Sequence, residues 1–364
     1  MYSNMKSTQF GFFDEADRLQ RLNKLNDPLV DLANLIDFEM FRPTLAEAFA
    51  KLEAQKTSLG NNSRPKSPAG RKPMDPVFMF KILILQRSYN LSDQQAEFQL
   101  VDRSSFRRFL GINAAQEVPD FTTVWRFREA LQKADAIKPL FDRFTQMLRE
   151  KGLILNEGVA IDASFVEVPR QRNTSEENEM IKQGIVPPEW KENPRKLCQK
   201  DLDARWAKKG EEVHYGYKDH AQIEVGSKFL TDYRVSDAAV HDSQLTEELI
   251  TEEHKGQPAF ADSAYKSEEC DERLEALGVE NFIHEKGARG RPLSELQKKK
   301  NTLKSQIRCR VEHVFGFMEN SMGGLFLRYI GMARNSVGIG LVNLTYNIFR
   351  FIQVTKMSKK AQKA

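Results

Sequence analysis

The run GVAIDASFVEV, at residues 158–168, constrains the fold of this 364-residue chain more than any other segment. Its apolar and β-branched residues are typical of a strand covered on both faces, as in a sheet flanked by helices. Asp162 stands in the middle of the run. An isolated ionised carboxylate is costly to bury, so a buried one is usually paired, hydrogen-bonded or metal-bound. The segment therefore predicts an α/β sheet with a carboxylate that needs a partner. An aspartate that caps a turn at a strand end is the alternative.

The residues after this run alternate between strand-like and helix-like patterns. The expected elements are strands at 220–226, 228–236, 258–265 and 279–284, and helices at about 243–253, 267–277, 307–320 and 341–353. Strands and helices that follow one another in this order predict an α/β fold with a mixed sheet flanked by helices.

The first 150 residues carry helical patterns instead. Helices are expected within 12–56 and at 76–90, and another begins at a capping box of Ser92 and Gln95. A shorter helix within 102–112 is expected to end at Gly111, and one more follows Pro119. Several of these short helices carry arginines: Arg103, Arg107, Arg108, Arg126 and Arg128. Short, capped and basic helices suit a DNA-binding module of the helix-turn-helix type. An ordinary helical domain with basic surfaces is the alternative.

The positive charge of the chain is concentrated in a few segments. The net charge is only +4, but residues 286–310 hold nine Lys or Arg and one acid, Glu295. A second basic stretch, at 59–73, is rich in Gly, Pro and Ser, and the tail at 356–364 is basic again. Cationic segments separated by mixed-charge regions indicate a polyanionic partner, most simply nucleic acid. For any single segment, a solvated loop is the alternative.

Other classes of protein are excluded by composition. Three cysteines without CxxC spacing do not make a disulfide framework, and the six histidines form no zinc motif. The N-terminal residues lack the apolar core of a signal peptide, and both long apolar stretches are too short or carry polar residues. We therefore expect a cytoplasmic protein with no membrane partner.

Two further acids accompany Asp162. Asp262 ends the apolar run AFAD, and Glu312 lies at the edge of the apolar stripe of helix 307–320, one turn after Arg308. An Arg308–Glu312 surface pair is the simplest interpretation of that helix alone. If the first and fourth strands are neighbours, however, the two aspartates meet and the late helix can bring Glu312 to them. Three such carboxylates predict two Mg²⁺ ions, for which Mn²⁺ could substitute, in a clamp for phosphodiester attack.

The order of several segments resembles a known family. IDASFVEV, YGYKDHAQIEV, VSDAAVHDSQ, FADSAYKSEE and RCRVEHVFGFMEN are similar to the RNase H-like catalytic core of bacterial insertion-sequence DDE transposases. The segments GRKPMDPVFMFKILILQRSYNLSDQQAEFQLVDRSSFRRFLGI and PDFTTVWRFREAL resemble the helical N-terminal domain of the same group. This resemblance implies that Asp162, Asp262 and Glu312 are the catalytic, metal-binding triad, with Mg²⁺ as the cofactor.

The chain departs from the pattern Y-x2-R-x3-E-x6-K that this group often shows around the third acid. Arg308 and Glu312 match it, but Ser305 stands in place of Tyr and Glu319 in place of Lys. A glutamate aimed at DNA would repel a phosphate. We therefore expect Glu319 to form a salt bridge with Arg308 or to face away from DNA.

The resemblance and the residue patterns together predict the organisation of the chain. The expected parts are a helical DNA-binding domain at 1–150 with a flexible basic segment at about 59–73, an RNase H-like catalytic domain at 151–355 with a polar insertion at about 170–212 and a basic segment at 286–304, and a basic tail at 356–364. The expected DNA contacts are Arg64, Lys66, Arg71, Lys72, Arg103, Arg107, Arg108, Arg126, Arg128, Arg289, Arg291, Lys298, Lys299, Lys300, Lys304, Arg308 and Arg310.

The predicted function is that of a transposase associated with the bacterial nucleoid. It would bind the terminal inverted repeats of its element as double-stranded DNA, cleave them, and join the 3′-hydroxyl ends to target DNA. Because two ends must be held together, we expect a homodimer in the synaptic complex. The alternatives are a transposase-derived DNA-binding protein without catalysis, and a metal-dependent RNase H-like nuclease without strand transfer.

Overall fold

The computed structural model describes residue 11 and residues 13–58, 72–287 and 292–362. Most of the predicted basic segment at 59–73 therefore lies outside the described residues, as do Arg289 and Arg291. Within the described ranges, no helix is long and apolar enough to cross a membrane.

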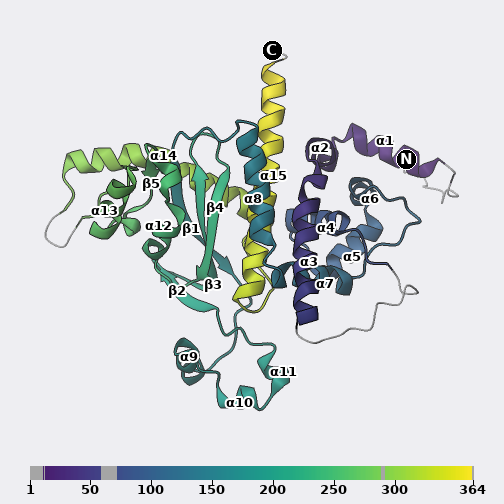
Figure 1. Ribbon diagram of the computed structural model, residues 1–364, viewed down its shortest axis with the longest axis horizontal. Helices are drawn as coiled ribbons and strands as arrows, with labels where there is room; N and C mark the ends of the chain where they lie inside the picture. The colour runs from purple at the N-terminus through teal and green to yellow at the C-terminus, as the bar shows by residue number, and fades with distance from the viewer. Residues whose placement is uncertain (1–10, 12, 59–71, 288–291, 363–364) are drawn as a thin grey trace, which may run out of the picture.

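A mixed sheet forms the centre of the C-terminal part (Figure 1). Its strands are β1 (Val159–Glu167), β2 (Arg205–Lys209), β3 (Glu212–Glu224), β4 (Leu230–Asp237), β5 (Pro258–Phe260) and β6 (Glu280–Asn281). They run in the order β2-β3-β1-β5-β6, and β4 pairs with the later part of β3. The pairs β1–β3, β2–β3 and β3–β4 are antiparallel, whereas β5 is parallel to both β1 and β6.

The central position of β1 explains its apolar sequence. It lies between β3 and β5 and is covered by helices, so Val159, Ala160 and Ile161 are all buried. In the parallel pair, Ala160 lies beside Phe260. When this register is continued by two residues along both chain segments, Asp162 lies opposite Asp262.

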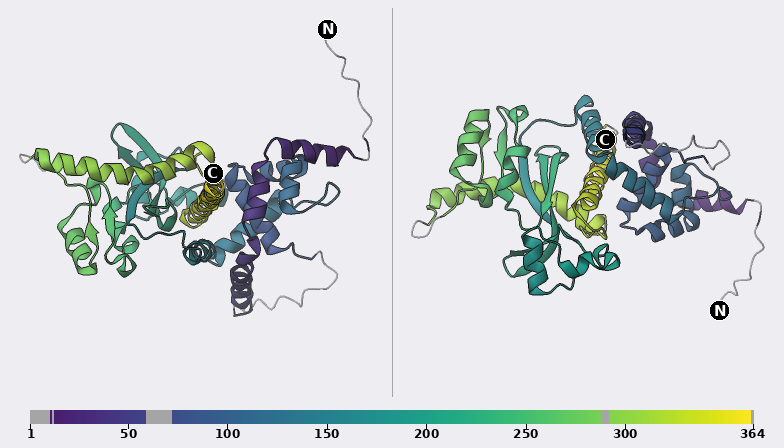
Figure 2. Two further views of the ribbon diagram at one scale, coloured as in Figure 1. Left: turned by 90° about the horizontal axis from the view of Figure 1, so that it is seen from above. Right: turned by 60° about the horizontal axis from the view of Figure 1, so that its bottom comes forward.

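Helices cover the sheet and extend from it (Figures 1 and 2). Near β5 and β6 lie η2 (Asp242–Leu245), α12 (Thr246–Leu249), η3 (Glu252–His254), η4 (Ser263–Tyr265) and α13 (Glu268–Leu277). The long α14 (Glu295–Ser321) crosses β1 and β5, and α15 (Met332–Ala361) stands between the sheet and the N-terminal helices. The predicted α/β fold, a mixed sheet flanked by helices, is confirmed.

The N-terminal region is helical, as predicted. It consists of α1 (Asp14–Lys24), α2 (Pro28–Leu35), η1 (Phe38–Phe41), α3 (Arg42–Ser58), α4 (Pro76–Ser88), α5 (Asp93–Asp102), α6 (Ser104–Leu110), α7 (Phe121–Lys133) and α8 (Ile137–Glu150). The capping box of Ser92 and Gln95 begins α5, and Gly111 ends α6 in the left-handed conformation. Asp120 caps α7 by accepting a hydrogen bond from the Thr123 amide at 2.6 Å.

One hydrophobic core runs through both parts of the chain. Phe144 of α8 is fully buried and stacks on Phe41, while its other contact is an edge-on one with Phe351 of α15. Two buried asparagines of α15 add polar links to the sheet. Asn343 donates to Asp219 at 3.1 Å, and Asn347 donates to the Leu230 carbonyl at 2.8 Å. The apolar core therefore does not end at residue 150.

Four local predictions differ from the structure. The strand expected at 258–265 shortens to β5, because Ser263–Tyr265 form η4. The polar segment 170–212 contains α9 (Ser175–Lys182), α10 (Pro188–Lys191), α11 (Pro194–Leu197) and β2, because a capping box at Thr174 and the fully buried Trp190 organise it. The helix expected at 243–253 is divided into η2, α12 and η3, since Ile250 is extended. The strand expected at 279–284 shortens to β6.

Candidate active site

Asp162 of β1 and Asp262, which follows the neighbouring parallel strand β5, lie close enough for their charges to interact. Asp162 lies on β1, and its Oδ1 accepts a hydrogen bond from the Ala163 amide at 2.9 Å. Asp262 follows β5 directly and caps η4, accepting a hydrogen bond from the Ala264 amide at 2.7 Å. The sequence prediction that these two aspartates lie on adjacent strands therefore agrees with the sheet order.

Helix α14 brings Glu312 to the same edge of the sheet, together with Arg308. The Arg308 guanidinium lies between two acids: Nη1 donates to Asp162 Oδ2 at 3.0 Å, and Nη2 donates to Glu312 Oε1. The Asp162 side chain is 16% exposed, whereas that of Glu312 is 52% exposed. One arginine thus connects the buried strand acid to the exposed helix acid. The structure therefore contains both the Arg308–Glu312 pair within α14 and the contact of Arg308 with Asp162.

The environment of Asp162 favours its neutral form. Burial, which has the largest effect, and the nearby negative charge of Asp262 together raise the pKa of this carboxyl group to about 6. The Arg308 charge and the Ala163 amide act in the opposite direction but do not cancel the effect of burial. A carboxyl group held in this way, at the edge of a sheet, is a frequent mark of a functional site.

The remaining neighbours of the acids form a compact shell. Tyr265 is fully buried, and its hydroxyl has no partner among the described residues. Burial, followed by the charges of Asp162 and other acids, raises the pKa of this phenol well above its usual value. On the other side, Ser305 Oγ lies 3.3 Å from His284 Nε2. Burial and the nearby cations Arg308 and Lys304 lower the pKa of His284.

The three acids provide suitable donors for a hard divalent cation. Carboxylate oxygens are the ligands that Mg²⁺ and Mn²⁺ prefer, and Asp162 lies on β1, Asp262 just after β5 and Glu312 on α14. A cationic group, the Arg308 guanidinium, already lies between two of them. Within the described residues, however, no three His, Cys, Asp or Glu side chains are close enough together to hold a metal. A metal held by all three acids would therefore require their side chains to move closer together than they lie here.

Glu319 does not pair with Arg308. It lies on the wall of a shallow groove beside β1, together with Glu167, Lys209 and Glu212. The structure gives Glu319 no ion pair with any described residue, and its side chain is exposed. The acids outnumber the cations in this groove, so it disfavours a DNA backbone.

The N-terminal arginines have different surroundings. Arg107 is buried and donates to the backbone carbonyls of Leu100, Asn113 and Gln116, and Arg108 pairs with Asp27. Arg128 is also buried and pairs with Asp93. All three are thus engaged within the protein.

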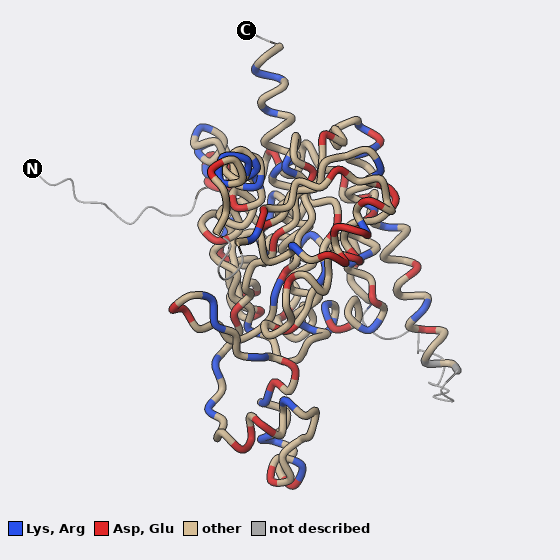
Figure 3. Tube along the Cα trace, turned by 90° about the vertical axis from the view of Figure 1, so that its left-hand side faces the viewer, with Lys and Arg blue, Asp and Glu red and all other residues tan. Residues whose placement is uncertain are grey.

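The other candidate cations are more accessible. Arg103 lies over the rings of Tyr89 and Phe106, and Arg126 and Lys72 are exposed. On α14, Lys298, Lys299 and Lys300 are exposed, whereas Lys304 donates to the Ile283 carbonyl and Arg310 to the Val225 carbonyl. Arg64, Lys66 and Arg71 lie outside the described residues. Residues of both charge signs are interspersed along the described trace (Figure 3).

Sequence reasoning missed His284 as a neighbour of the acids. It follows the shortened strand β6, and β6 is parallel to β5. A signal was present, because the ends of neighbouring parallel strands meet at one edge of a sheet. Ser305, which stands in place of the tyrosine of the family pattern, faces His284.

Comparison with known proteins agrees with this arrangement. A family model described as "Transposase DDE domain" matches residues 155–348, and a second, described as "Transposase domain (DUF772)", matches residues 17–130. Among solved structures, the chain is similar to a piggyBac transposase in a synaptic complex with hairpin DNA, at 14% identity and a TM-score of 0.46, with 92% of this chain and 76% of that chain covered. Since the first model spans more than half of its residues, the chain belongs to the transposase family that carries the DDE domain.

Proposed function

We propose that this member of the family is an active DNA transposase of an insertion sequence. It binds the terminal inverted repeats of its element, cleaves a phosphodiester bond at the boundary, and joins the 3′-hydroxyl end to target DNA. The observation that supports this proposal best is that Arg308 joins Asp162 of β1 to Glu312 of α14, while Asp262 follows β5, the parallel neighbour of β1.

The three acids are proposed to hold divalent cations. Two bound Mg²⁺ ions would supply positive charge that activates the attacking oxygen and stabilises the leaving one. Asp162 suits this role because β1 holds its backbone in the sheet, and Asp262 because it caps η4 just after β5. Glu312 suits it because its exposed side chain can turn toward them. Sites built on strands and helices are positioned more accurately than sites on loops.

Arg308 is proposed to have two successive partners. Without metal it neutralises Asp162 and Glu312 and limits the repulsion between the acids. Once those acids are occupied elsewhere, its guanidinium is free to bind a DNA phosphate, which its planar donor pattern suits well. Its buried Nε, which has no partner among the described residues, is one more donor for such a contact.

The proposed DNA surface uses the accessible cations. Lys298, Lys299 and Lys300 on α14 contact the backbone on the catalytic side, and Lys72 and Arg126 contact it on the N-terminal side. Arg107 and Arg108 are left out because they are engaged within the protein. A homodimer that holds two element ends remains part of the proposal.

Strand joining tests this function against a nuclease of the same fold. Purified protein is incubated with Mg²⁺, a labelled pre-cleaved element end that carries a free 3′-hydroxyl, and a supercoiled plasmid as target. We expect covalent transfer of the label to the plasmid, and no transfer from a matched end that terminates in a 3′-deoxy nucleotide. Cleavage of intact ends without any transfer would instead identify a hydrolytic nuclease.

A further inference from the structure

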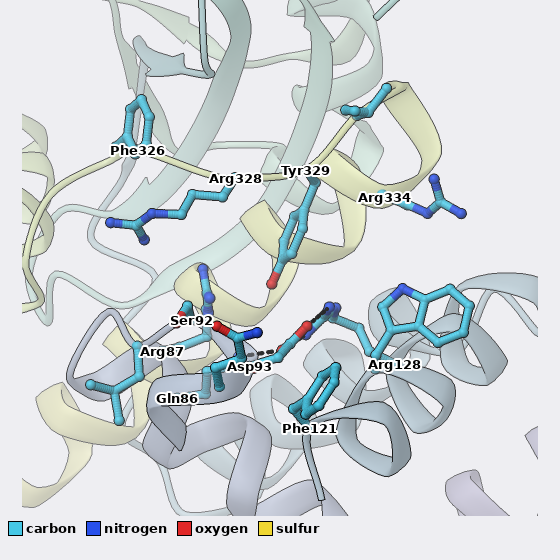
Figure 4. Close-up of a pocket in the computed structure, with 14 residues that line it drawn as sticks. Gln86, Arg87, Ser92, Asp93, Phe121, Arg128, Phe326, Arg328, Tyr329 and Arg334 are labelled. Carbon is cyan, nitrogen blue, oxygen red and sulfur yellow. Dashed lines mark hydrogen bonds and ion pairs between the residues drawn. The ribbon is translucent and has the colours of Figure 1, made fainter. Parts of the chain in front are cut away.

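A cationic cavity separate from the acids lies between the N-terminal helices and the segment that joins α14 to α15 (Figure 4). Its volume is about 470 Å³, within the range of sites for small ligands or single residues of a polymer. Helices α4, α5 and α7 form one wall, and Phe326–Ile330 forms the other. Four arginines line it: Arg87, Arg128, Arg328 and Arg334.

One of these arginines is buried without a direct ion-pair partner among the described residues, and the carboxylate on which its charge acts is Asp93. Arg87 is 6% exposed, and the structure gives its guanidinium no hydrogen bond or ion pair with any described residue. Its Nε is buried and has no hydrogen-bond partner among the described residues. The guanidinium lies over the Tyr329 ring, whose centroid is 5.6 Å away. The Tyr329 hydroxyl, which points into the same cavity, is a second buried polar group without a partner (Figure 4). Unpaired buried charges are costly, so this site is suited to an anion.

The acids near the cavity are already neutralised. Asp93 accepts two hydrogen bonds from Arg128, at 2.6 and 2.7 Å, and one from Gln86. Arg334 is paired with Glu129 at 2.7 Å. Arg87 and Arg328 form no ion pair with a described carboxylate, so the cavity keeps an excess of positive charge, unlike the acidic groove beside β1.

Aromatic side chains line the cavity beside the arginines. Trp125 and Phe121 of α7 are 41% and 44% exposed, which is unusual for such large apolar groups. Both belong to the cavity wall. A phosphate-binding arginine next to an open aromatic face is the combination that binds a nucleotide, because the base stacks while the phosphate is neutralised.

We propose that this cavity binds one nucleotide of a DNA strand, with its phosphate on Arg87 and Arg328 and its base on Trp125. The proposal rests on the function proposed above, since it takes DNA as the substrate. Phe326 lies where β1 ends, because the Glu167 amide donates to the Leu325 carbonyl at 2.9 Å. Five residues of strand separate Glu167 from Asp162, about 17 Å at ~3.3 Å per residue. Phe326, which lines the cavity, therefore lies about one strand length from Asp162.

Three substitutions, Trp125→Ala, Arg328→Gln and Arg87→Met, test the cavity. DNA affinity is measured by fluorescence anisotropy with a labelled duplex of the element end that carries a short single-stranded tail. Trp125→Ala should weaken binding about five- to a hundredfold without changing its salt dependence, because stacking releases no counterions. Arg328→Gln should weaken binding and reduce the slope of log K against log salt by about 0.9. Both side chains are exposed, so the variants should fold, and Arg143→Gln on α8 serves as a control that retains wild-type affinity.

Substitution of the buried Arg87 distinguishes a DNA contact from a purely structural role, because the two predict opposite changes in melting temperature. Arg87→Met should raise the melting temperature, because it removes an uncompensated buried charge, and should weaken DNA binding. A lower melting temperature with unchanged DNA affinity would make Arg87 structural and overturn the proposal.

The remaining outcomes separate the cavity from the wider function. Wild-type affinity in both Trp125→Ala and Arg328→Gln, with DNA that the wild type cleaves, would overturn the cavity alone. A wild-type protein that neither binds nor cleaves the element end would instead overturn the proposed function. Thymidine monophosphate and inorganic phosphate are titrated separately, with tryptophan fluorescence as the signal. Tight binding of the free nucleotide, together with unchanged DNA affinity in the variants, would assign the cavity to a free nucleotide and contradict the DNA contact.

Discussion

Replacing either strand acid, as Asp162→Asn or Asp262→Asn, should reduce cleavage at the element end by at least about a thousandfold, or ~4 kcal/mol of transition-state stabilisation. The amide keeps the shape of the side chain but loses the charge that holds a divalent cation. Binding of the uncleaved duplex, measured by anisotropy in EDTA, should change little, because the exposed cations that we propose as DNA contacts are unaltered. A variant that loses DNA binding together with cleavage would show a structural role for the acid instead.

The thermal stability of Asp162→Asn further distinguishes an acid that holds a cation from an acid with a structural role. The pKa of Asp162 is raised to about 6 in the folded protein, so folding binds a proton and stability falls as the pH rises from about 4 to about 6. At pH 7 the wild type carries this penalty and the asparagine variant does not. In EDTA, the variant should therefore melt at or above the wild-type temperature at pH 7. A clearly lower melting temperature would mean that the ion pair with Arg308 is worth more than the burial costs.

Phe144→Ala should lower the free energy of unfolding by about 3–5 kcal/mol, measured by urea denaturation. Phe144 is fully buried, and its ring contacts Phe41 of η1 and Phe351 of α15. Its removal leaves a cavity at the point where the N-terminal helices, α8 and α15 share one core. Because that core is continuous, we expect far-UV circular dichroism and tryptophan fluorescence to report the same lowered midpoint.

The same substitution at an exposed position provides the control. Phe98 of α5 is 64% exposed, so Phe98→Ala should change the free energy of unfolding by no more than about 0.5 kcal/mol. Equal effects of the two substitutions would contradict the shared core, as would two separate transitions in the Phe144 variant.

Local pattern was sufficient to predict much of the fold and the elements on or beside which the three acids lie. The apolar run around Asp162 indicated a strand covered on both faces, and the run before Asp262 indicated another. Because parallel neighbours end at the same edge of a sheet, the two acids could be placed together once the strand order was assumed. The helix of Glu312 followed from its apolar stripe, and the caps of α5 and α6 from single residues.

Tertiary contacts could not be predicted in the same way. Nothing local distinguishes Arg126, which is exposed, from Arg107, which is buried against backbone carbonyls. Arg308 was expected to be either a surface partner of Glu312 or a DNA contact, and its bond to Asp162 joins residues 146 positions apart. The cationic cavity likewise depends on Tyr329 reaching Arg87 across the fold.

The most direct test of the central proposal measures nicking of a labelled duplex that carries the element's own end, with Mg²⁺ or EDTA. Wild type is compared with Glu312→Gln and with Glu319→Gln, which removes an exposed carboxylate from the same helix two turns later. We expect metal-dependent nicking at the element boundary in wild type and Glu319→Gln, and none in Glu312→Gln. Tight binding without cleavage by all three proteins, or equal cleavage by wild type and Glu312→Gln, would contradict the proposal and leave Glu312 as the salt-bridge partner of Arg308.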